Sequence, residues 1–292
     1  MNAKYLLVPG LALLFSCSNN DDESDAFGNF ETEETIISSE TVGKLVHFPL
    51  ELGDQVQAGD LLAVVDTTQL SLQIRQLDAQ EQAVAAKRVN IRAQADVLKA
   101  QIANLKITQD RIVRMFADKA ATQQQLDDVN GQMRVLEKQL ESNNAQNVSV
   151  DRELDVIGAQ LSLAKDNLAK SFVRTLTPGT VLEKYVEPGE VVSPAKALVK
   201  LGDLSELDLR VYVSGAQLPE IKLGQEVEVW IDQDADNNRS MKGKVTWISS
   251  EAEFTPKIIQ TKEERVKLVY AVKVTVKNDG SLKIGMPGEV RF

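Results

Sequence analysis

The residue types that carry most enzymatic and metal chemistry are scarce in this sequence of 292 residues. It contains one cysteine, Cys17, and one histidine, His47, so neither a disulfide framework nor a Cys/His zinc site can form within one chain. Adjacent carboxylates such as Asp127 and Asp128 diverge on a helix or a strand and are typical of solvated charges. These observations predict a protein that is not an enzyme and that holds no cofactor or metal.

The charge balance excludes a further class of function. The chain has 33 basic and 43 acidic residues and a net charge of −10, which does not fit a basic stripe for nucleic acid. Aromatic residues make up 5% of the sequence, whereas Gln, Ala, Leu and Val are abundant. This composition favours long helices and simple β-modules over an aromatic-lined ligand pocket.

The N-terminal residues resemble a bacterial lipoprotein signal. The apolar run from Tyr5 to Phe15 is shorter than the roughly 20 residues needed to span a bilayer. It ends in Leu14-Phe15-Ser16-Cys17, which resembles a lipobox and implies that Cys17 is lipidated and becomes the mature N-terminus. An ordinary signal peptide with an incidental cysteine is the alternative. We therefore expect a signal peptide over 1–17 and an acidic, flexible tether over 18–37.

Two stretches of the chain, 41–66 and 177–202, repeat each other at a constant offset. Corresponding glycines mark the turns of the two copies: Gly43 and Gly53 in the first, Gly179 and Gly189 in the second. One copy of about 25 residues is too small to bury its own apolar face. The repeat therefore predicts that both copies pack together into a small β-sandwich that is split by a long insert.

The second copy carries a family resemblance. The sequence Gly-Thr-Val-Leu-Glu-Lys-Tyr-Val-Glu-Pro-Gly-Glu-Val-Val-Ser-Pro at 179–194 resembles half of a biotinyl/lipoyl-like domain, especially that of HlyD-type periplasmic adaptors (membrane fusion proteins). The resemblance implies a lipoyl-like domain made of 38–66 and 173–203. A carrier domain would present a lysine at its hairpin tip, but the first copy has Val65-Asp66-Thr67 where its chain turns outward, so a swinging-arm carrier is not expected.

The insert, 67–172, has the pattern of an antiparallel coiled-coil hairpin, because apolar residues recur every seven positions in both halves. The two rows are Leu70, Leu77, Val84, Ile91, Leu98, Leu105 and Ile112, and Leu126, Met133, Leu140, Asn147, Leu154, Leu161 and Leu168. Pairing Ile112 with Leu126, and continuing along both rows, aligns every pair when the tip lies near residue 119. Each arm is then on the order of 75 Å long.

The predicted seam and turn contain polar residues with identifiable roles. Asn147, and Asn143 in a companion row of the second half, place amides in the seam, where they either fix the register or mark a looser stretch. Lys119-Ala120-Ala121 is the expected turn. Thr122 is expected to cap the second helix in a capping box with Gln125.

The tip resembles that of HlyD-type adaptors that engage TolC-like channels. In those adaptors an Arg is followed four residues later by Leu and, seven beyond that, by Ser; this sequence has Arg111, Met115 and Thr122 at the same spacing. The resemblance implies that these three residues contact an outer-membrane channel as a cation, an apolar knob and a hydroxyl. The alternative is a solvated Arg, a core Met and an ordinary helix cap.

From Leu207 onward the apolar period changes to two, which is typical of strands. Strands are expected at 207–213, 227–231, 243–249, 266–277 and 288–292. Short strands separated by turn residues predict a small β-barrel over 204–292, with a single helical turn between the first two strands.

Two further motifs resemble HlyD-type adaptors linked to ABC exporters. Phe254-Thr-Pro-Lys257 with Gln260-Thr261 is similar to a motif of that group, and Gly285-Met-Pro-Gly288 is similar to the closing strand of their barrel. The sequence ends at Phe292, directly after this strand, whereas adaptors of resistance-nodulation pumps usually continue into another domain. These features favour an ABC-type transporter as the partner.

The expected fold class is α+β, with a long antiparallel coiled-coil α-hairpin inserted in a split lipoyl-like β-sandwich and followed by a small β-barrel. The resemblance implies a periplasmic adaptor that is lipid-anchored at the inner rather than the outer membrane and assembles as a homo-oligomer, a ring of six subunits. Such a ring links an inner-membrane transporter to a TolC-like channel for efflux or secretion. A resistance-nodulation pump as the partner, or a scaffold that tethers membranes without an exporter, are the alternatives.

Overall fold

The computed structural model describes residues 24–234, 237–254 and 268–292. These residues form two compact units, one of residues 35–201 and one that joins the segment up to residue 34 with 202–292. The predicted lipidation residue Cys17 and the part of the exporter-type motif from residue 255 onward lie outside the described residues.

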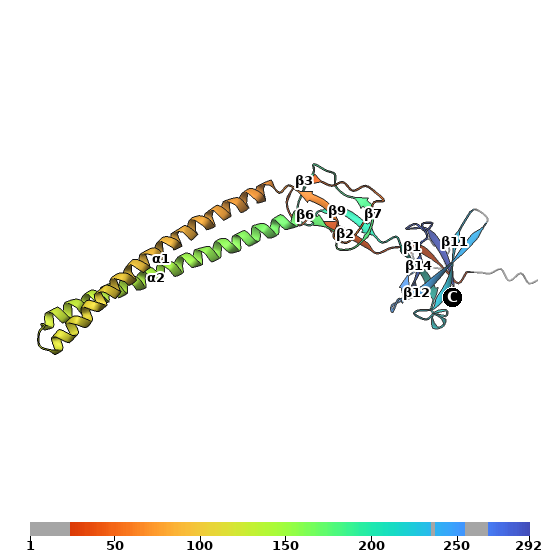
Figure 1. The fold of residues 1–292 in the computed structure, drawn as a ribbon. Coiled ribbons are helices and arrows are strands. Elements are labelled where there is room, and N and C mark those ends of the chain that lie inside the picture. Colours follow the sequence, from red (N-terminus) through yellow and green to blue (C-terminus); the bar gives the residue numbers. More distant parts are fainter. Residues whose placement is uncertain (1–23, 235–236, 255–267) are drawn as a thin grey trace, which may run out of the picture. The chain divides into compact units, whose positions relative to one another are not determined.

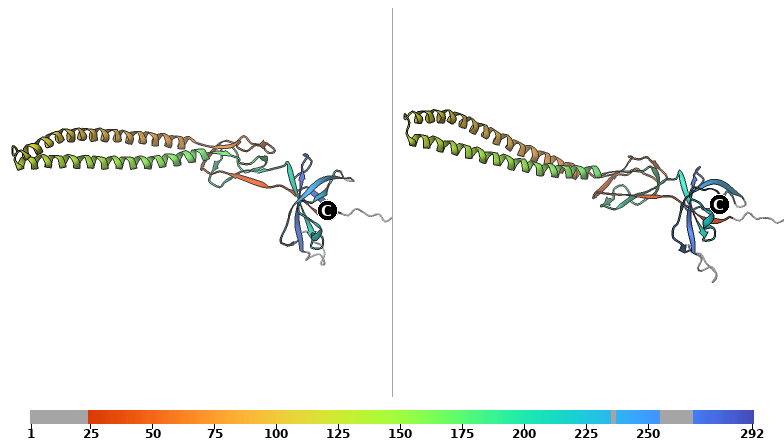
Figure 2. Two further views of the ribbon diagram at one scale, coloured as in Figure 1. Left: turned by 60° about the horizontal axis from the view of Figure 1, so that its bottom comes forward. Right: turned by 90° about the horizontal axis from the view of Figure 1, so that it is seen from below.

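Two long helices dominate the first unit. α1 (Thr68–Ala117) and α2 (Gln123–Lys170) lie side by side in opposite directions and lead away from the strands of the same unit (Figures 1 and 2). Every residue of the two predicted heptad rows is buried or half-buried. The predicted coiled-coil hairpin is therefore confirmed, and its turn spans 118–122, around the predicted residue 119.

Contacts between the helices agree with the predicted pairing. Near the tip, Gln109 Nε2 donates a hydrogen bond to Asn130 Oδ1 over 2.8 Å. In the half of the hairpin nearer the strands, Arg88 Nη1 lies 3.4 Å from Asp151 Oδ1. Around the Arg88–Asp151 pair the seam holds an apolar cluster, which consists of Val84, Val150 and Ile157 with Ile91 and Leu154 packed against it. The helices are thus held in one register by apolar contacts at the centre and polar contacts at the edge.

α1 also contributes a second seam row that the heptad analysis missed. Its members are half-buried, apart from the fully buried Ala95: Ile74, Glu81, Arg88, Ala95, Ile102 and Gln109. Long polar side chains cover apolar surface with their aliphatic stems, so they occupy seam positions without an apolar pattern in the sequence.

Among the described residues, neither long helix has the apolar stretch that crossing a bilayer requires.

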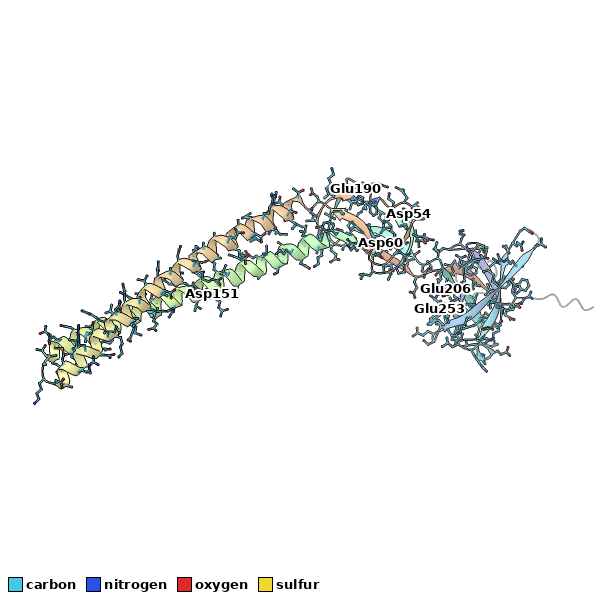
Figure 3. All side chains as sticks on the ribbon, in the orientation of Figure 1. Asp54, Asp60, Asp151, Glu190, Glu206 and Glu253 are labelled. Carbon is cyan, nitrogen blue, oxygen red and sulfur yellow. The ribbon has the colours of Figure 1, made fainter. Side chains whose placement is uncertain are left out.

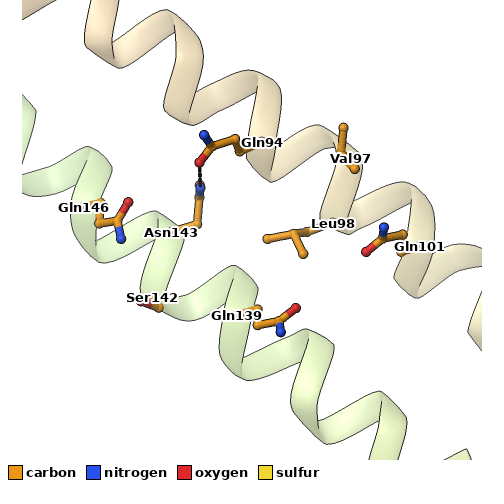
Figure 4. A pocket seen from close by; sticks show the side chains of 8 residues that line it. All are labelled: Gln94, Val97, Leu98, Gln101, Gln139, Ser142, Asn143 and Gln146. Carbon is orange, nitrogen blue, oxygen red and sulfur yellow. Dashed lines mark hydrogen bonds between the residues drawn. The ribbon is translucent and has the colours of Figure 1, made fainter.

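The seam is least well satisfied at the two predicted asparagines. Asn143 is 6% exposed, and its Nδ2 donates to Gln94 Oε1 over 3.4 Å (Figure 4). The Oδ1 atoms of Asn143 and Asn147 are buried without a hydrogen-bond partner, and a groove of about 450 Å³ opens beside Asn143 and Leu98. A buried polar atom without a partner costs about 1–3 kcal/mol. These features favour a looser stretch of seam over a register lock.

Eight short strands of the first unit form two four-stranded sheets in the orders β2-β9-β7-β4 and β6-β5-β3-β8. The strands are β2 (Glu34–Ser38), β3 (Gly43–His47), β4 (Gln55–Val56), β5 (Leu61–Val65), β6 (Phe172–Arg174), β7 (Gly179–Lys184), β8 (Val191–Val192) and β9 (Ala197–Gly202). One core of Val, Leu, Ala and Phe side chains from both halves lies between them. Each sheet therefore contains strands from before and after the helices.

The two copies of the repeat pair reciprocally. β3 pairs with β8 and β4 with β7, each time joining one copy to the other. The Leu45 N–H donates to the Glu190 carbonyl over 2.8 Å, and at the equivalent position the Val181 N–H donates to the Asp54 carbonyl over 2.9 Å. Asp54 and Glu190 are labelled in Figure 3. The prediction that both copies pack together into a β-sandwich is confirmed.

The second unit is a closed β-barrel. Its strands are β1 (Ala26–Glu31), β10 (Glu206–Ser214), β11 (Glu226–Asp232), β12 (Asn238–Ile248), β14 (Leu268–Lys277) and β15 (Pro287–Arg291), with β13 (Glu253–Phe254) paired to β14. β10 pairs with both β1 and β14, so six strands form a ring around one apolar core. The single helical turn after β10 is the short 3₁₀ helix η1 (Leu218–Glu220).

The predicted flexible tether over 18–37 is wrong for the part that the structure describes. β1 pairs with β10 and β15 and buries Ala26 and Phe30 in the barrel core. The repeat extends upstream of residue 41, so β2 occupies the place in the first copy that β6 occupies in the second. At the equivalent ends of these strands, the Ser39 N–H donates to the Lys196 carbonyl and the Thr175 N–H donates to the Asp60 carbonyl. The barrel accordingly begins before residue 204, because an N-terminal strand closes it.

The seam amides generate a prediction about stability. Replacing both residues, Asn143→Leu with Asn147→Leu, is expected to raise the free energy of unfolding by about 1–3 kcal/mol, because the removal of two buried oxygens without partners outweighs the loss of the Asn143–Gln94 hydrogen bond. Thermal unfolding followed by far-UV circular dichroism measures this change. The exposed neighbour gives a matched control, since Asn144→Leu is expected to change stability by no more than about 0.5 kcal/mol. A double variant less stable than the wild type would show that the amides hold the register.

Candidate docking site at the hairpin tip

α1 ends in a Schellman motif at the tip. The Lys119 N–H donates to the Phe116 carbonyl over 3.0 Å, and the Ala120 N–H donates to the Met115 carbonyl over 2.8 Å. Lys119 takes the position usually held by glycine, with a φ of 60°. A residue with a Cβ is disfavoured there by about 1 kcal/mol, so this conformation is held by the turn around it. The motif fixes the backbone that joins the two helices.

α2 begins with the predicted capping box, which is confirmed. Thr122 Oγ1 accepts a hydrogen bond from the Gln125 N–H over 3.2 Å, and the Thr122 N–H donates to Gln125 Oε1 over 2.8 Å. Two of the helix's otherwise unpaired N–H groups are thereby satisfied. Thr122 is thus the N-cap of α2, and its hydroxyl stabilises the start of this helix whether or not it also contacts another protein.

The other two predicted tip residues lie on the last turns of α1. Arg111 and Met115 are four residues apart and therefore on one face of the helix, and both are exposed, Met115 by 39%. Two exposed apolar neighbours, Val113 (47%) and Phe116 (37%), were not predicted from the sequence, because they lie outside the predicted motif. A helix end with three exposed apolar side chains beside an arginine has the composition of a protein-binding surface.

Both helices also carry apolar residues on their outer faces. On α1 every seventh residue from position 72 is apolar and exposed: Leu72, Ala79, Ala86, Ala93, Ala100 and Ile107. On α2 a second exposed row at the same spacing contains Val135, Ser142, Ser149, Val156 and Leu163. These rows were not predicted from the sequence, although alanine recurs every seven residues along the first of them.

The pKa shifts of Lys138, Glu141 and Asp66 arise from local structural contacts. Lys138 and Glu141, whose side chains lie 2.6 Å apart on the surface of α2, hold the pKa of the lysine above and that of the glutamate below their usual values. Hydrogen bonds from Thr68 lower the pKa of Asp66 where α1 begins. His47 lies exposed on β3. Within residues 24–234, 237–254 and 268–292 no three His, Cys, Asp or Glu side chains come together as metal ligands.

Comparison with known proteins agrees with this architecture. The model of the CzcB-like, barrel-sandwich hybrid domain family matches residues 33–203, which contain both the split sandwich and the hairpin. A curated UPF0194 membrane protein of Yersinia pseudotuberculosis is 36% identical over 127 residues, which is 43% of this chain and 38% of that protein. One from Acidithiobacillus ferridurans is 36% identical over 135 residues, 46% of this chain and 39% of that protein. The aligned part thus spans well under half of these relatives.

Solved structures show the same fold at low sequence identity. MacA from Actinobacillus actinomycetemcomitans superposes with a TM-score of 0.66 at 21% identity, covering 91% of this chain and 76% of that one. The membrane fusion protein Spr0693 from Streptococcus pneumoniae R6 gives a TM-score of 0.51 at 19% identity, covering 91% and 99%. Because the family match alone extends over more than half of the sequence, this chain belongs to the CzcB-like, barrel-sandwich hybrid domain family.

Proposed function

We propose that this chain is the periplasmic adaptor of a tripartite exporter and links an inner-membrane transporter to a TolC-like outer-membrane channel. The observation that carries the proposal is the hairpin itself. Two helices of 50 and 48 residues, each on the order of 75 Å long, form a two-helix arm with an exposed apolar and cationic end. An arm of this length has no role inside its own unit, whereas it suits a spacer that docks at its tip.

Sequence motifs support a proposal for the transporter class and another for the membrane anchor. An ABC-type transporter is the proposed partner, because Phe254-Thr-Pro-Lys257 and Gly285-Met-Pro-Gly288 resemble adaptors of that group. Lipidation of Cys17 is proposed to hold the chain at the inner membrane, on the periplasmic side. The membrane fusion protein Spr0693 has the same fold, which supports the adaptor role.

The outer apolar rows of the hairpin support assembly into a ring, which we propose has six subunits. Ile107 of the α1 row is 71% exposed and Leu163 of the α2 row is 62% exposed, although neither contributes to the seam. Packing α1 of one subunit against α2 of the next would bury both rows, and the alanines of α1 permit a close approach of the helices.

The ring generates a prediction about oligomeric state. Placing one charge in the α1 row, Ala93→Glu, is expected to weaken self-association at least tenfold, because each subunit contact would bury an unpaired carboxylate. Light scattering after gel filtration measures the mass of the assembly. Asn144→Glu adds the same charge at an exposed position outside both rows and is the control. Equal masses for the two variants would contradict the ring contact.

The tip generates a prediction about channel binding. Arg111→Glu is expected to weaken binding of the channel by roughly tenfold, since a charge-assisted hydrogen bond is replaced by repulsion. Far-UV circular dichroism should be unchanged, because Arg111 is exposed. The control is Arg92→Glu, at an exposed position in the middle of α1. Unchanged export and channel binding in Arg111→Glu would argue against the tip assignment.

The whole function is tested by purification of the chain from its native membranes under mild conditions. The proposal predicts that a transporter with ATPase subunits and an outer-membrane channel are recovered together with it. Recovery of a proton-driven resistance-nodulation pump would replace the transporter class, and recovery of neither a transporter nor a channel would favour a membrane-tethering scaffold.

A further inference from the structure

The outer face of the barrel carries three aromatic side chains in one row across neighbouring strands. Phe27 on β1 and Trp230 on β11 both stand opposite Glu289 of β15, one on each side. The register that pairs Gly28 with Val211 sets Tyr212 of β10 beside Phe27. We call Phe27, Tyr212 and Trp230 the aromatic row. The row is notable because aromatic residues make up only 5% of the chain.

The aromatic row lies outside the barrel core. Phe27 is 60% exposed, and Tyr212 and Trp230 are half-buried, whereas their strand neighbours Ala26 and Val229 point inward and are buried. A cleft of about 390 Å³ is lined by the row together with Pro287 of β15. An exposed phenylalanine beside such a cleft costs solvation free energy in water, so we expect another apolar phase or molecule to cover it.

Two arginines flank the aromatic row. The Arg291 guanidinium lies 4.7 Å from the centre of the Trp230 ring, and the Arg210 guanidinium lies 5.8 Å from that of Tyr212. Arg210 is also held by Glu253, with two contacts of 3.0 Å. Tryptophan, tyrosine and arginine together are enriched where proteins meet the headgroup region of a bilayer, because each has an apolar body and a polar end.

The short distance along the chain between Cys17 and the barrel indicates what covers the aromatic row. The described residues begin at Ser24, whose hydroxyl donates to Glu289, and the Asp25 N–H donates to the Val290 carbonyl over 3.0 Å. Ser24 is seven residues after Cys17. At no more than ~3.5 Å per residue, these seven residues span at most about 25 Å. A lipid on Cys17 therefore keeps Ser24, which contacts Glu289 in the middle of the aromatic row, within about 25 Å of the bilayer surface.

We infer that the aromatic row is a membrane-docking patch that inserts into the headgroup region of the bilayer that holds the lipid anchor. The inference rests on the proposed lipidation of Cys17. Phe27 provides the apolar contact, Tyr212 and the two arginines provide polar ends, and Trp230, whose Nε1 is buried, adds apolar ring surface. One acyl chain gives only marginal membrane binding, so a second contact next to it makes the attachment stable and orients the barrel.

The charges around the row decide which force drives docking. Glu289 and Asp232 of the cleft, together with Glu253, outnumber Arg210 and Arg291 by one, so the patch has no net positive charge that would attract anionic lipids. Burial of apolar surface then contributes more than attraction to anionic lipids. Docking is accordingly expected to be insensitive to salt and similar on zwitterionic and anionic bilayers.

The test supplies the anchor chemically, so that it does not depend on lipidation in the cell. The chain from Cys17 onward retains every described residue, and its single cysteine is coupled to a maleimide lipid in zwitterionic vesicles. Trp247→Phe leaves Trp230 as the only tryptophan. Brominated acyl chains in the same vesicles quench its fluorescence on contact. The inference predicts a blue shift and strong quenching of Trp230 that persist at high salt.

Two variants separate docking by the row from mere proximity to the vesicle. Phe27→Ser is expected to lower the docked-to-undocked ratio about tenfold, because the main apolar contact is lost. Leu223→Ser removes another side chain, 69% exposed, that does not line the cleft, and should leave quenching unchanged. Emission unaffected by brominated lipid, equal quenching in the Phe27 variant, or quenching abolished by salt would each overturn the patch. Intact mass of the protein extracted from membranes tests lipidation of Cys17 separately.

Discussion

The hairpin depends on the reciprocal strand pairing of the split sandwich. β3 with β8 and β4 with β7 each join a strand before the helices to a strand after them. Since β5 leads into α1 and α2 leads into β6, and β5 pairs with β6, the two ends of the insert are held next to each other. A long insert between distant segments would otherwise pay a large closure entropy. Here the pairing of β5 with β6 holds the two ends of the insert together, so the helices need only stay in contact along the seam.

The seam extends this constraint toward the tip. Small apolar clusters such as Val84 with Val150 and Ile157 fix the helices, whereas the unsatisfied oxygens of Asn143 and Asn147 leave a weaker stretch between those clusters and the tip. At the end of the arm a Schellman motif and a capping box close the turn within five residues, 118–122. The exposed Arg111 and Met115 are thus presented on a well-defined helix end, although the arm between has room to adjust.

Much of this could be predicted from the sequence wherever a periodic pattern is long or repeated. The rows through Leu77 and Met133 recur over the whole of each helix, and the capping box needed only Thr122 and Gln125. β1 was missed because one short strand has no period of its own and its partners, β10 and β15, lie at the far end of the chain. The left-handed Lys119 was missed because the sequence has no glycine there. Which partner the tip meets depends on a second protein's surface.

The most direct test of the adaptor account is site-specific photo-crosslinking in living cells. A photoreactive residue in place of Met115, at the exposed end of α1, is expected to form an adduct with an outer-membrane channel. The same residue in place of Ile107, in the outer row, should form adducts only with further copies of this chain. Channel adducts from Met115 alone would support docking through the tip. No adduct from Met115, or the same channel adduct from both positions, would contradict it.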